Sequence, residues 1–194
     1  MFVAGVLFLI SFNIASANIL INEIMYDLEG TDTDREWVEV YNSGSTSIDL
    51  STYKFFDALT PHELYAIIRL RNEVFVVEQS CVFQDADNKD QHCHHLMLWD
   101  NDTLVAYARL VPKGLAYEQM SIGRIISSPA YRNTGAGKLL VANAIETCYE
   151  LFGKGPIKIG AQLYLQKFYE SFGFVQTSDI YDEDGIDHIE MIKE

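Results

Sequence analysis

The segment Arg132 to Lys138, RNTGAGK, is a glycine loop that precedes a long apolar helix pattern. Two closely spaced glycines lie between two cations, which suggests a phosphate-binding turn. A P-loop has a glycine five residues before its Gly-Lys pair and a hydroxyl residue after it, but Arg132 and Leu139 stand there. A dinucleotide-binding loop needs a third glycine or alanine where this chain has Leu140. The loop therefore predicts a strand–loop–helix unit of another kind.

Hydrophobic spacing around the loop predicts an α/β domain in which strands and helices alternate. The box Thr60-Pro61-His62-Glu63 is typical of a helix start, and Leu64, Ile67, Ile68 and Arg71 follow it at helical spacing. This helical region extends through VFVVEQ. The expected strands are 96–99, 104–111, 122–127, 157–161, 174–175 and 188–192, and the later helices are 135–151 and 163–172.

The composition limits the partners that the chain can have. Its 194 residues carry a formal net charge of −14, which repels phosphate backbones and anionic lipid surfaces. Nucleic acid and stable membrane partners are therefore disfavoured, and a cationic or amine substrate is mildly favoured. The three cysteines, Cys81, Cys93 and Cys148, show no paired spacing, which argues against a disulfide framework and for a reducing compartment.

The first residues point to a different compartment. Met1 to Phe12 is an apolar run that is too short to span a bilayer, and Ala15-Ser16-Ala17 resembles a cleavage site. Residues 1–17 are thus expected to be a signal-peptide-like segment, with a buried first strand or helix as the alternative. Export and a reducing interior contradict each other, so the localisation stays open.

Residues 18–55 have a strand pattern of their own. Alternation predicts strands at 19–24 and 37–41, a turn follows at 42–45, and a third strand begins at Ile48. The stretches INEIMYD, REWVEVYN and IDLSTYKF resemble the opening of a lamin-tail domain, an immunoglobulin-like sandwich. Such a sandwich needs about seven strands, so three strands form only a partial domain. Lys54 to Phe56 are the exception, because they also suit a first strand of the following domain.

The rest of the chain has a second and longer resemblance. The order IGRII, SSPAYR, Arg132-x-x-Gly135-x-Gly137 and helix resembles the acyl-CoA loop of GNAT N-acetyltransferases. LRNEVFVVEQSCVFQDAD, LVAYARLVP, AQLYLQKFYESFGF and YDEDGIDHIEM are similar to the ElaA-type branch of that superfamily and span residues 56–194. The resemblance implies the α/β GNAT acyl-CoA N-acyltransferase fold, with a mixed, splayed central sheet and flanking helices. It also implies acetyl-CoA as cosubstrate, while the amine acceptor, small molecule or peptide, and the oligomeric state remain unidentified.

The same resemblance implies where acetyl-CoA binds. Backbone N–H groups at a helix N-terminus favour a pyrophosphate, and glycines let it approach the backbone closely. The pantetheine arm is expected to pair with the strand backbone, and Gln162 is expected near the acyl end. The implied donor-binding residues are Ile125, Ile126, Ser127, Arg132, Asn133, Thr134, Gly135, Ala136, Gly137, Lys138 and Gln162.

Acetyl transfer to an amine requires a base for the amine and an acid for the departing thiolate. Tyr169 is the expected acid, because the helix that bears it lines the thiol end in the resembling family. Glu78 is the candidate base, with Glu73 considered beside it, and either carboxylate also suits a solvated helix surface. The alternative for Tyr169 is a tyrosine that only packs in the core. The alternatives for the whole chain are a secreted lamin-tail-type binding module and an acyl-CoA-binding protein without catalysis.

Two metal-like motifs are not expected to bind metal. HCHH at 92–95 places four adjacent residues that cannot all reach one ion, and no second ligand pair has zinc spacing. DADNKD at 85–90 begins like an EF-hand, but Lys89, Asp90 and Leu96 occupy key positions of that loop. A polar loop is expected there.

Overall fold

The structure is a computed structural model that describes residues 19–25, 37–42 and 52–194. The chain divides into two compact units, Met1–Ile48 and Asp49–Glu194. In the first unit, strands β1 (Ile19–Met25) and β2 (Trp37–Asn42) pair antiparallel, which confirms the two predicted strands. The signal-peptide-like segment, the turn after β2 and the strand expected from Ile48 lie outside the described residues. The lamin-tail origin of this unit stays a prediction.

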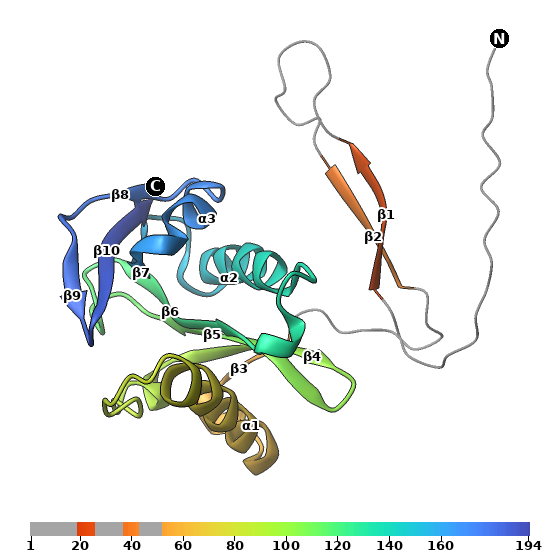
Figure 1. The fold of residues 1–194 in the computed structure, drawn as a ribbon, viewed down its shortest axis with the longest axis horizontal. Coiled ribbons are helices and arrows are strands. Elements are labelled where there is room, and N and C mark those ends of the chain that lie inside the picture. The colour runs from red at the N-terminus through yellow and green to blue at the C-terminus, as the bar shows by residue number, and fades with distance from the viewer. Residues whose placement is uncertain (1–18, 26–36, 43–51) are drawn as a thin grey trace, which may run out of the picture. The chain divides into compact units, whose positions relative to one another are not determined.

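The second unit is built on an eight-stranded sheet (Figure 1). Its order is β3-β4-β5-β6-β7-β10-β8, and β9 pairs with β10. All pairs are antiparallel except β6 with β7, which is parallel. The strands are β3 (Thr52–Phe55), β4 (His94–Asp100), β5 (Thr103–Val111), β6 (Met120–Ser127), β7 (Ile157–Gln162), β8 (Val175–Gln176), β9 (Tyr181–Glu183) and β10 (Ile186–Lys193).

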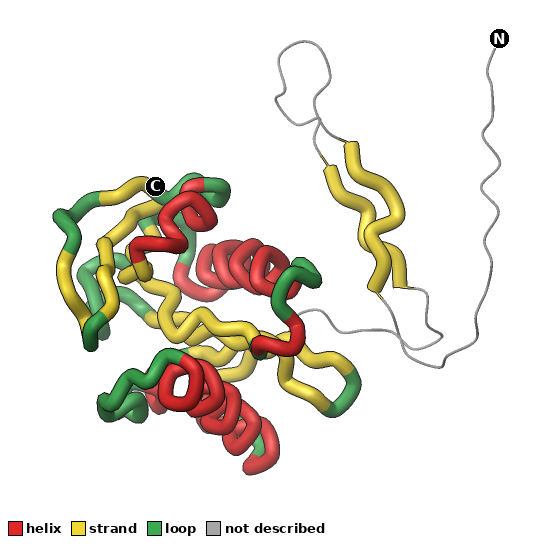
Figure 2. The backbone as a smooth tube through the Cα atoms, in the orientation of Figure 1, coloured by secondary structure: helices red, strands yellow, loops and turns green. Residues whose placement is uncertain are grey.

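Helices cover both faces of this sheet (Figure 2). Helix α1 (Pro61–Arg71) continues as a π-helix, Asn72–Glu78, and packs on β5 and β6. Helix α2 (Ala136–Phe152) packs on the opposite face, and α3 (Gln166–Glu170) follows a 3₁₀ turn at Leu163–Leu165. The single helix predicted for 163–172 is therefore two short pieces.

The start of α1 follows the capping box that its sequence predicts. The Glu63 backbone N–H donates to Thr60 Oγ1 at 3.2 Å, and the Thr60 N–H donates to Glu63 Oε2 at 2.8 Å. These two bonds satisfy donors that a helix end otherwise leaves free, and Pro61 supplies the first helical residue.

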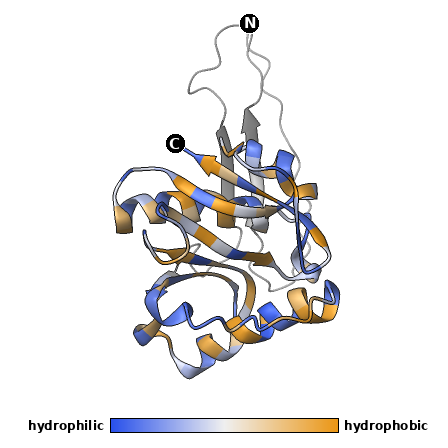
Figure 3. Cartoon of the chain, turned by 90° about the vertical axis from the view of Figure 1, so that its left-hand side faces the viewer, coloured by the Kyte–Doolittle hydropathy of each residue, from blue (hydrophilic) through white to orange (hydrophobic). Residues whose placement is uncertain are grey.

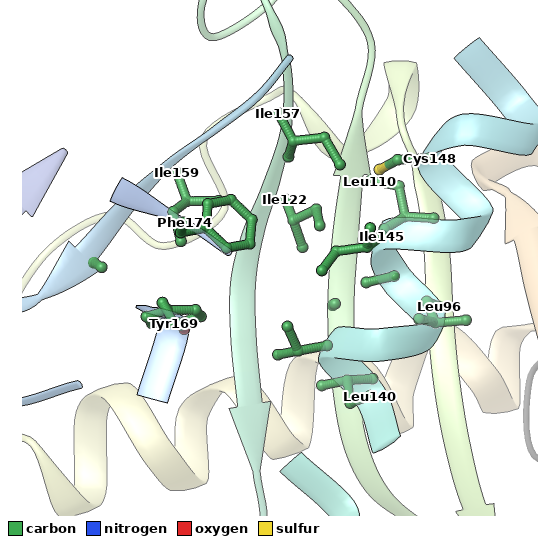
Figure 4. Close-up of a cluster of buried hydrophobic side chains, with 14 of the residues drawn as sticks. Leu96, Leu110, Ile122, Leu140, Ile145, Cys148, Ile157, Ile159, Tyr169 and Phe174 are labelled. Carbon is green, nitrogen blue, oxygen red and sulfur yellow. The ribbon is translucent and has the colours of Figure 1, made fainter. Parts of the chain in front are cut away.

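Hydrophobic and hydrophilic residues are interspersed along the strands and helices (Figure 3), and the buried hydrophobic side chains form two clusters. The larger cluster joins α2 and α3 to the sheet and includes Leu96, Leu110, Ile145, Ile159 and Phe174 (Figure 4). The smaller cluster joins α1 and the π-helix to the sheet through Ile67, Leu70, Val74, Met97, Leu104, Tyr107 and Ile126. Each face is thus held by its own hydrophobic core.

The sheet opens between β6 and β7. Their parallel pairing consists of Met120 with Ile157 and Ser121 with Lys158, after which the two strands are no longer paired. Strand β6 also contains an extra residue, because Gly123 and Ile126 face Arg109 and Tyr107 of β5, two positions apart on that strand. Such a bulge bends a strand. The splayed mixed sheet expected for the GNAT acyl-CoA N-acyltransferase fold is therefore confirmed.

Strand β3 belongs to this sheet rather than to the first unit. Thr52 to Phe55 pair with His94 to Met97, and the compact unit begins at Asp49, whereas the sequence analysis ended the preceding segment at residue 55. The Lys54 ammonium also donates to both Glu63 carboxylate oxygens, at 2.8 and 3.0 Å. Lys54 to Phe56 were expected to suit either segment, and the pairing of Thr52 to Phe55 with β4 decides for the second.

Two truncations test this boundary. Removing residues 1–48 should leave the melting temperature of the second unit unchanged, since β3 and its partners remain. Removing residues 1–55 exposes the edge of β4 and deletes the Lys54–Glu63 contact; a loss of about 2 kcal/mol would lower the melting temperature by roughly 4–8 °C. Equal melting temperatures for the two proteins, measured by circular dichroism, would show that β3 adds nothing to the sheet.

Candidate functional site

The glycine loop ends at an uncapped helix N-terminus. Gly135 is the N-cap of α2 with a left-handed φ of 91°, and the first helical bond runs from the Leu139 N–H to the Gly135 carbonyl at 3.0 Å. In the part of the chain that the structure describes, no side chain caps α2, and a Cβ on Gly135 or Gly137 would meet nothing within 4 Å. The first turn of α2 thus has N–H groups without a side-chain cap and open space beside both glycines, as anion binding requires.

Side-chain hydrogen bonds fix the residues that precede Gly135. Thr134 Oγ1 donates to the Tyr131 carbonyl at 2.6 Å, and the Tyr131 hydroxyl donates to Asp100 Oδ2 at 3.0 Å. Asn133 adopts a left-handed φ of 63°, which asparagine tolerates better than most residues. The loop is thus fixed to the end of β4, while the exposed Lys138 side chain projects from the first turn of α2.

The end of β6 presents a free backbone edge. Ile126 and Ser127 pair with Tyr107 and Ala106 of β5 on one side, whereas their other side faces the opening toward β7. Ile126 is buried, and Ile125 and Ser127 are half-buried. An extended ligand can pair with this edge as a neighbouring strand would, which is the arrangement expected for the pantetheine arm.

Arg132 and Glu78, predicted for different roles, contact each other. The Arg132 guanidinium donates to both carboxylate oxygens of Glu78, from Nη2 to Oε2 at 2.5 Å and from Nη1 to Oε1. Both side chains are more than one-third exposed. The hydrogen bonds and charge of Arg132 lower the pKa of Glu78, although partial burial acts in the opposite direction. Glu73, the other carboxylate considered, instead accepts a hydrogen bond from Ser128 Oγ at 3.2 Å.

Gln162 is the centre of a small polar chain that the sequence analysis did not foresee. Its Nε2 donates to Gln79 Oε1 at 3.2 Å, and the Tyr164 hydroxyl donates to its Oε1 at 2.5 Å. Gln79 directly follows Glu78, and Tyr164 follows Gln162 by two residues, so these side chains connect the end of the π-helix to the end of β7. The sequence signal that could have found Gln79 and Tyr164 was their closeness to the predicted residues Glu78 and Gln162.

Tyr169 lies in the larger hydrophobic cluster and is only 5% exposed (Figure 4). Its ring contacts Phe168 and Phe174 edge-on, with centroids 5.1 and 6.1 Å apart. Burial, and then the nearby Tyr164, raise the pKa of Tyr169 well above its ordinary value. The phenol is therefore protonated at neutral pH, and its ring also fills the core.

The HCHH and DADNKD motifs both lie within the residues that the structure describes. No group of three or more metal-ligating side chains occurs there. His95 instead contacts the Tyr107 hydroxyl at 2.8 Å and the Asp90 carbonyl at 3.0 Å. The DADNKD loop binds arginine side chains, which its description as a polar loop did not foresee. The described helices also include none that is long and apolar enough to cross a membrane.

Comparison with known proteins agrees with the fold. The sequence model of the acetyltransferase (GNAT) domain matches residues 71–194. A lamin tail domain model matches residues 13–117, but its second half overlaps β4 and β5 of the GNAT sheet and so assigns no separate domain.

Relatives and solved structures cover most of the second unit. ElaA of Escherichia coli K12 is 44% identical over 138 residues, which are 70% of this chain and 90% of ElaA. A UPF0039 protein of Schizosaccharomyces pombe is 44% identical over 141 residues, covering 72% of this chain and 93% of its own.

An acyl-CoA N-acyltransferase from Pseudomonas aeruginosa superposes with a TM-score of 0.71 at 41% identity, covering 74% of this chain and 99% of that one. The E. coli ElaA structure gives a TM-score of 0.70, also at 41% identity, and covers 74% and 98%. The chain has the open sheet and the free β6 edge described above, and a glycine loop at an uncapped helix N-terminus. The family model and the relatives show that it belongs to the GNAT family of acetyltransferases, enzymes that use an acyl-CoA cosubstrate.

Proposed function

We propose that the protein transfers an acetyl group from acetyl-CoA to a primary amine, by direct attack of the amine on the thioester. The observation that carries this proposal is the left-handed, uncapped N-terminus of α2 beside the free edge of β6. The first feature suits a pyrophosphate and the second suits an extended amide-containing arm. Together they match the two ends of a coenzyme A chain.

The residues of the loop fit the donor. The N–H groups of residues 133–138 and the positive end of the α2 dipole favour the pyrophosphate, and Lys138 adds a charge at the same end. Arg132 can join them once its guanidinium leaves Glu78. The backbone of Ile125, Ile126 and Ser127 receives the pantetheine arm, and Gln162 lies at the far side of the opening.

The acceptor needs a base. A lysine-like amine with a pKa of about 10.4 costs roughly 4–5 kcal/mol to deprotonate at pH 7. We assign this role to Glu78, either directly or through water, because it stands at the end of the π-helix beside Gln79 and Gln162. The formal charge of −14 favours cationic acceptors, whether small molecules or peptides.

The departing thiolate needs a proton or a hydrogen bond. We assign Tyr169 this role, since its phenol keeps its proton and its ring packs in the cluster that includes Ile159 and Ala161 of β7. Because the raised pKa of Tyr169 disfavours complete proton transfer before the thiolate forms, its contribution is greatest late in the reaction.

The donor loop is tested by Gly135→Val. A β-branched side chain is strained at a φ of 91°, and it would occupy the open space above the helix end, so coenzyme A should no longer raise the melting temperature. Gly114→Val is the matched control, because Gly114 has a φ of 84° and equally open surroundings. It should lower stability but retain the shift. A full shift in Gly135→Val would remove the loop from the donor site.

The base is tested by Glu78→Gln. Without the carboxylate, Arg132 is free for the donor, so coenzyme A should bind about two- to fivefold more tightly, the range of an exposed ion pair. Turnover should fall by roughly 10²-fold or more, because no carboxylate accepts the amine proton. Calorimetry and a thiol-release assay give the two values, with Glu150→Gln as the control for lost charge. Unchanged turnover would leave Glu78 as a surface partner of Arg132.

The acid is tested by Tyr169→Phe. The change keeps the ring in its packing and removes the hydroxyl, so turnover should fall by roughly 10²–10³-fold while coenzyme A affinity stays the same. Tyr164→Phe, which removes an exposed hydroxyl from the Gln162 chain, should cost less. Turnover of Tyr169→Phe near that of the unmodified protein would make Tyr169 a packing residue.

A further inference from the structure

The bulge in β6 contains an arginine in a conformation that favours glycine. Arg124 has a φ of 52°, although Gly123 stands next to it. A left-handed backbone costs a non-glycine residue about 1–2 kcal/mol. A glycine at position 124 would adopt this conformation without that cost, so the arginine side chain must gain its stability elsewhere.

The Arg124 side chain has several partners outside its own strand. Its Nε donates to Asp85 Oδ1 at 2.7 Å, and its Nη2 donates to the Asp85 carbonyl at 3.3 Å. The guanidinium also lies 5.8 Å from the ring centre of Phe75 and 5.5 Å from that of Phe83. Charge-assisted bonds and cation–π contacts of this kind offset the backbone cost.

The loop that receives Arg124 is itself fixed by two buried arginines. Arg71 donates to Asp85 Oδ2 at 2.7 Å, to the Asp85 carbonyl at 2.8 Å and to Asp90 Oδ2 at 2.8 Å. Arg109 donates to both oxygens of Asp87, at 2.7 and 2.9 Å, and to Asp90 Oδ1 at 2.8 Å. Arg71 and Arg109 are 2% and 4% exposed. The loop 85–90 is therefore a rigid anchor.

The bulge lies between the last pairing of β6 with β7, at Ser121, and the free edge at residues 125–127. A bulge sets the direction in which a strand continues. Any change in the backbone at Arg124 is therefore transmitted to the edge that follows it.

We propose that Arg124 is a positioning residue: held by Asp85, its guanidinium fixes the β6 bulge and thereby the place of the acyl arm along residues 125–127. The inference rests on the proposed function for its catalytic consequence. Its structural part, that the Arg124–Asp85 contact holds the β6 edge, is independent of the acceptor.

Arg124→Gly separates this role from a merely structural one. Glycine accepts the backbone conformation, so the protein folds, but the guanidinium is lost. A misplaced acyl group should lower kcat by roughly 10–100-fold, while coenzyme A still raises the melting temperature through the loop at 132–138. Arg124→Lys keeps the charge and should recover part of kcat. Lys89→Ala, in the same loop, is the control and should leave kcat unchanged.

Asp85→Asn tests the partner. It should lower kcat, and it should also lower the melting temperature, because Asp85 accepts from the buried Arg71 as well. The losses of kcat in the double variant should be less than additive, because both changes remove the Arg124–Asp85 contact. An Arg124→Gly kcat near that of the unmodified protein, or strictly additive losses, would overturn the proposal.

Hydrogen exchange distinguishes a failure of this inference from a failure of the proposed function. Amides of residues 122–128 should exchange faster in Arg124→Gly than in the unmodified protein, whether or not an amine is acetylated. Unchanged exchange in this segment would overturn the role of Arg124. Faster exchange in a protein without amine-dependent turnover would support the role of the Arg124–Asp85 contact and reject the acetyltransferase activity.

Discussion

The parting of β6 from β7 is the constraint on which the rest of the structure depends. Two parallel strands that stay paired would satisfy each other's backbone groups and leave no room for a ligand. Here the pairing ends at Ser121, and an extra residue in β6 bends the strand. The cost is that the backbone of residues 125–127 has no partner strand on its β7 side, which the proposed pantetheine arm would supply. Two separate hydrophobic cores, one for each face, keep the opened sheet in place.

Charge pairs organise the residues around this opening. Burial by itself would raise the pKa of Asp90, but hydrogen bonds from Arg109 and Arg71 outweigh it, so the pKa is lowered and the carboxylate stays charged. The exposed Arg132–Glu78 pair is of another kind. It links Arg132, the cation proposed to bind the donor, to Glu78, the candidate base, and a phosphate that competes for Arg132 would release the carboxylate for the amine.

Local rules made much of the fold predictable. The Thr60 capping box, the glycine loop and the strand expected at 104–111 each depend on residues close in sequence, and the structure has the corresponding elements. Long-range pairing was harder to predict. Arg71 was read as one more position of a helical face, yet it binds Asp85 and Asp90, and β3 joined the GNAT sheet through β4. The contact of Arg132 with Glu78 spans 54 residues, and no local pattern indicates it.

The proposed activity requires that an amine receives the acetyl group. Its most direct test incubates the full chain with acetyl-CoA and a panel of primary amines, and follows both free thiol and the mass of each amine. We expect thiol release that depends on the amine, rises with pH as more amine is neutral, and is matched by one added acetyl group per thiol. Coenzyme A that binds without amine-dependent thiol release, for every amine in the panel, would contradict it.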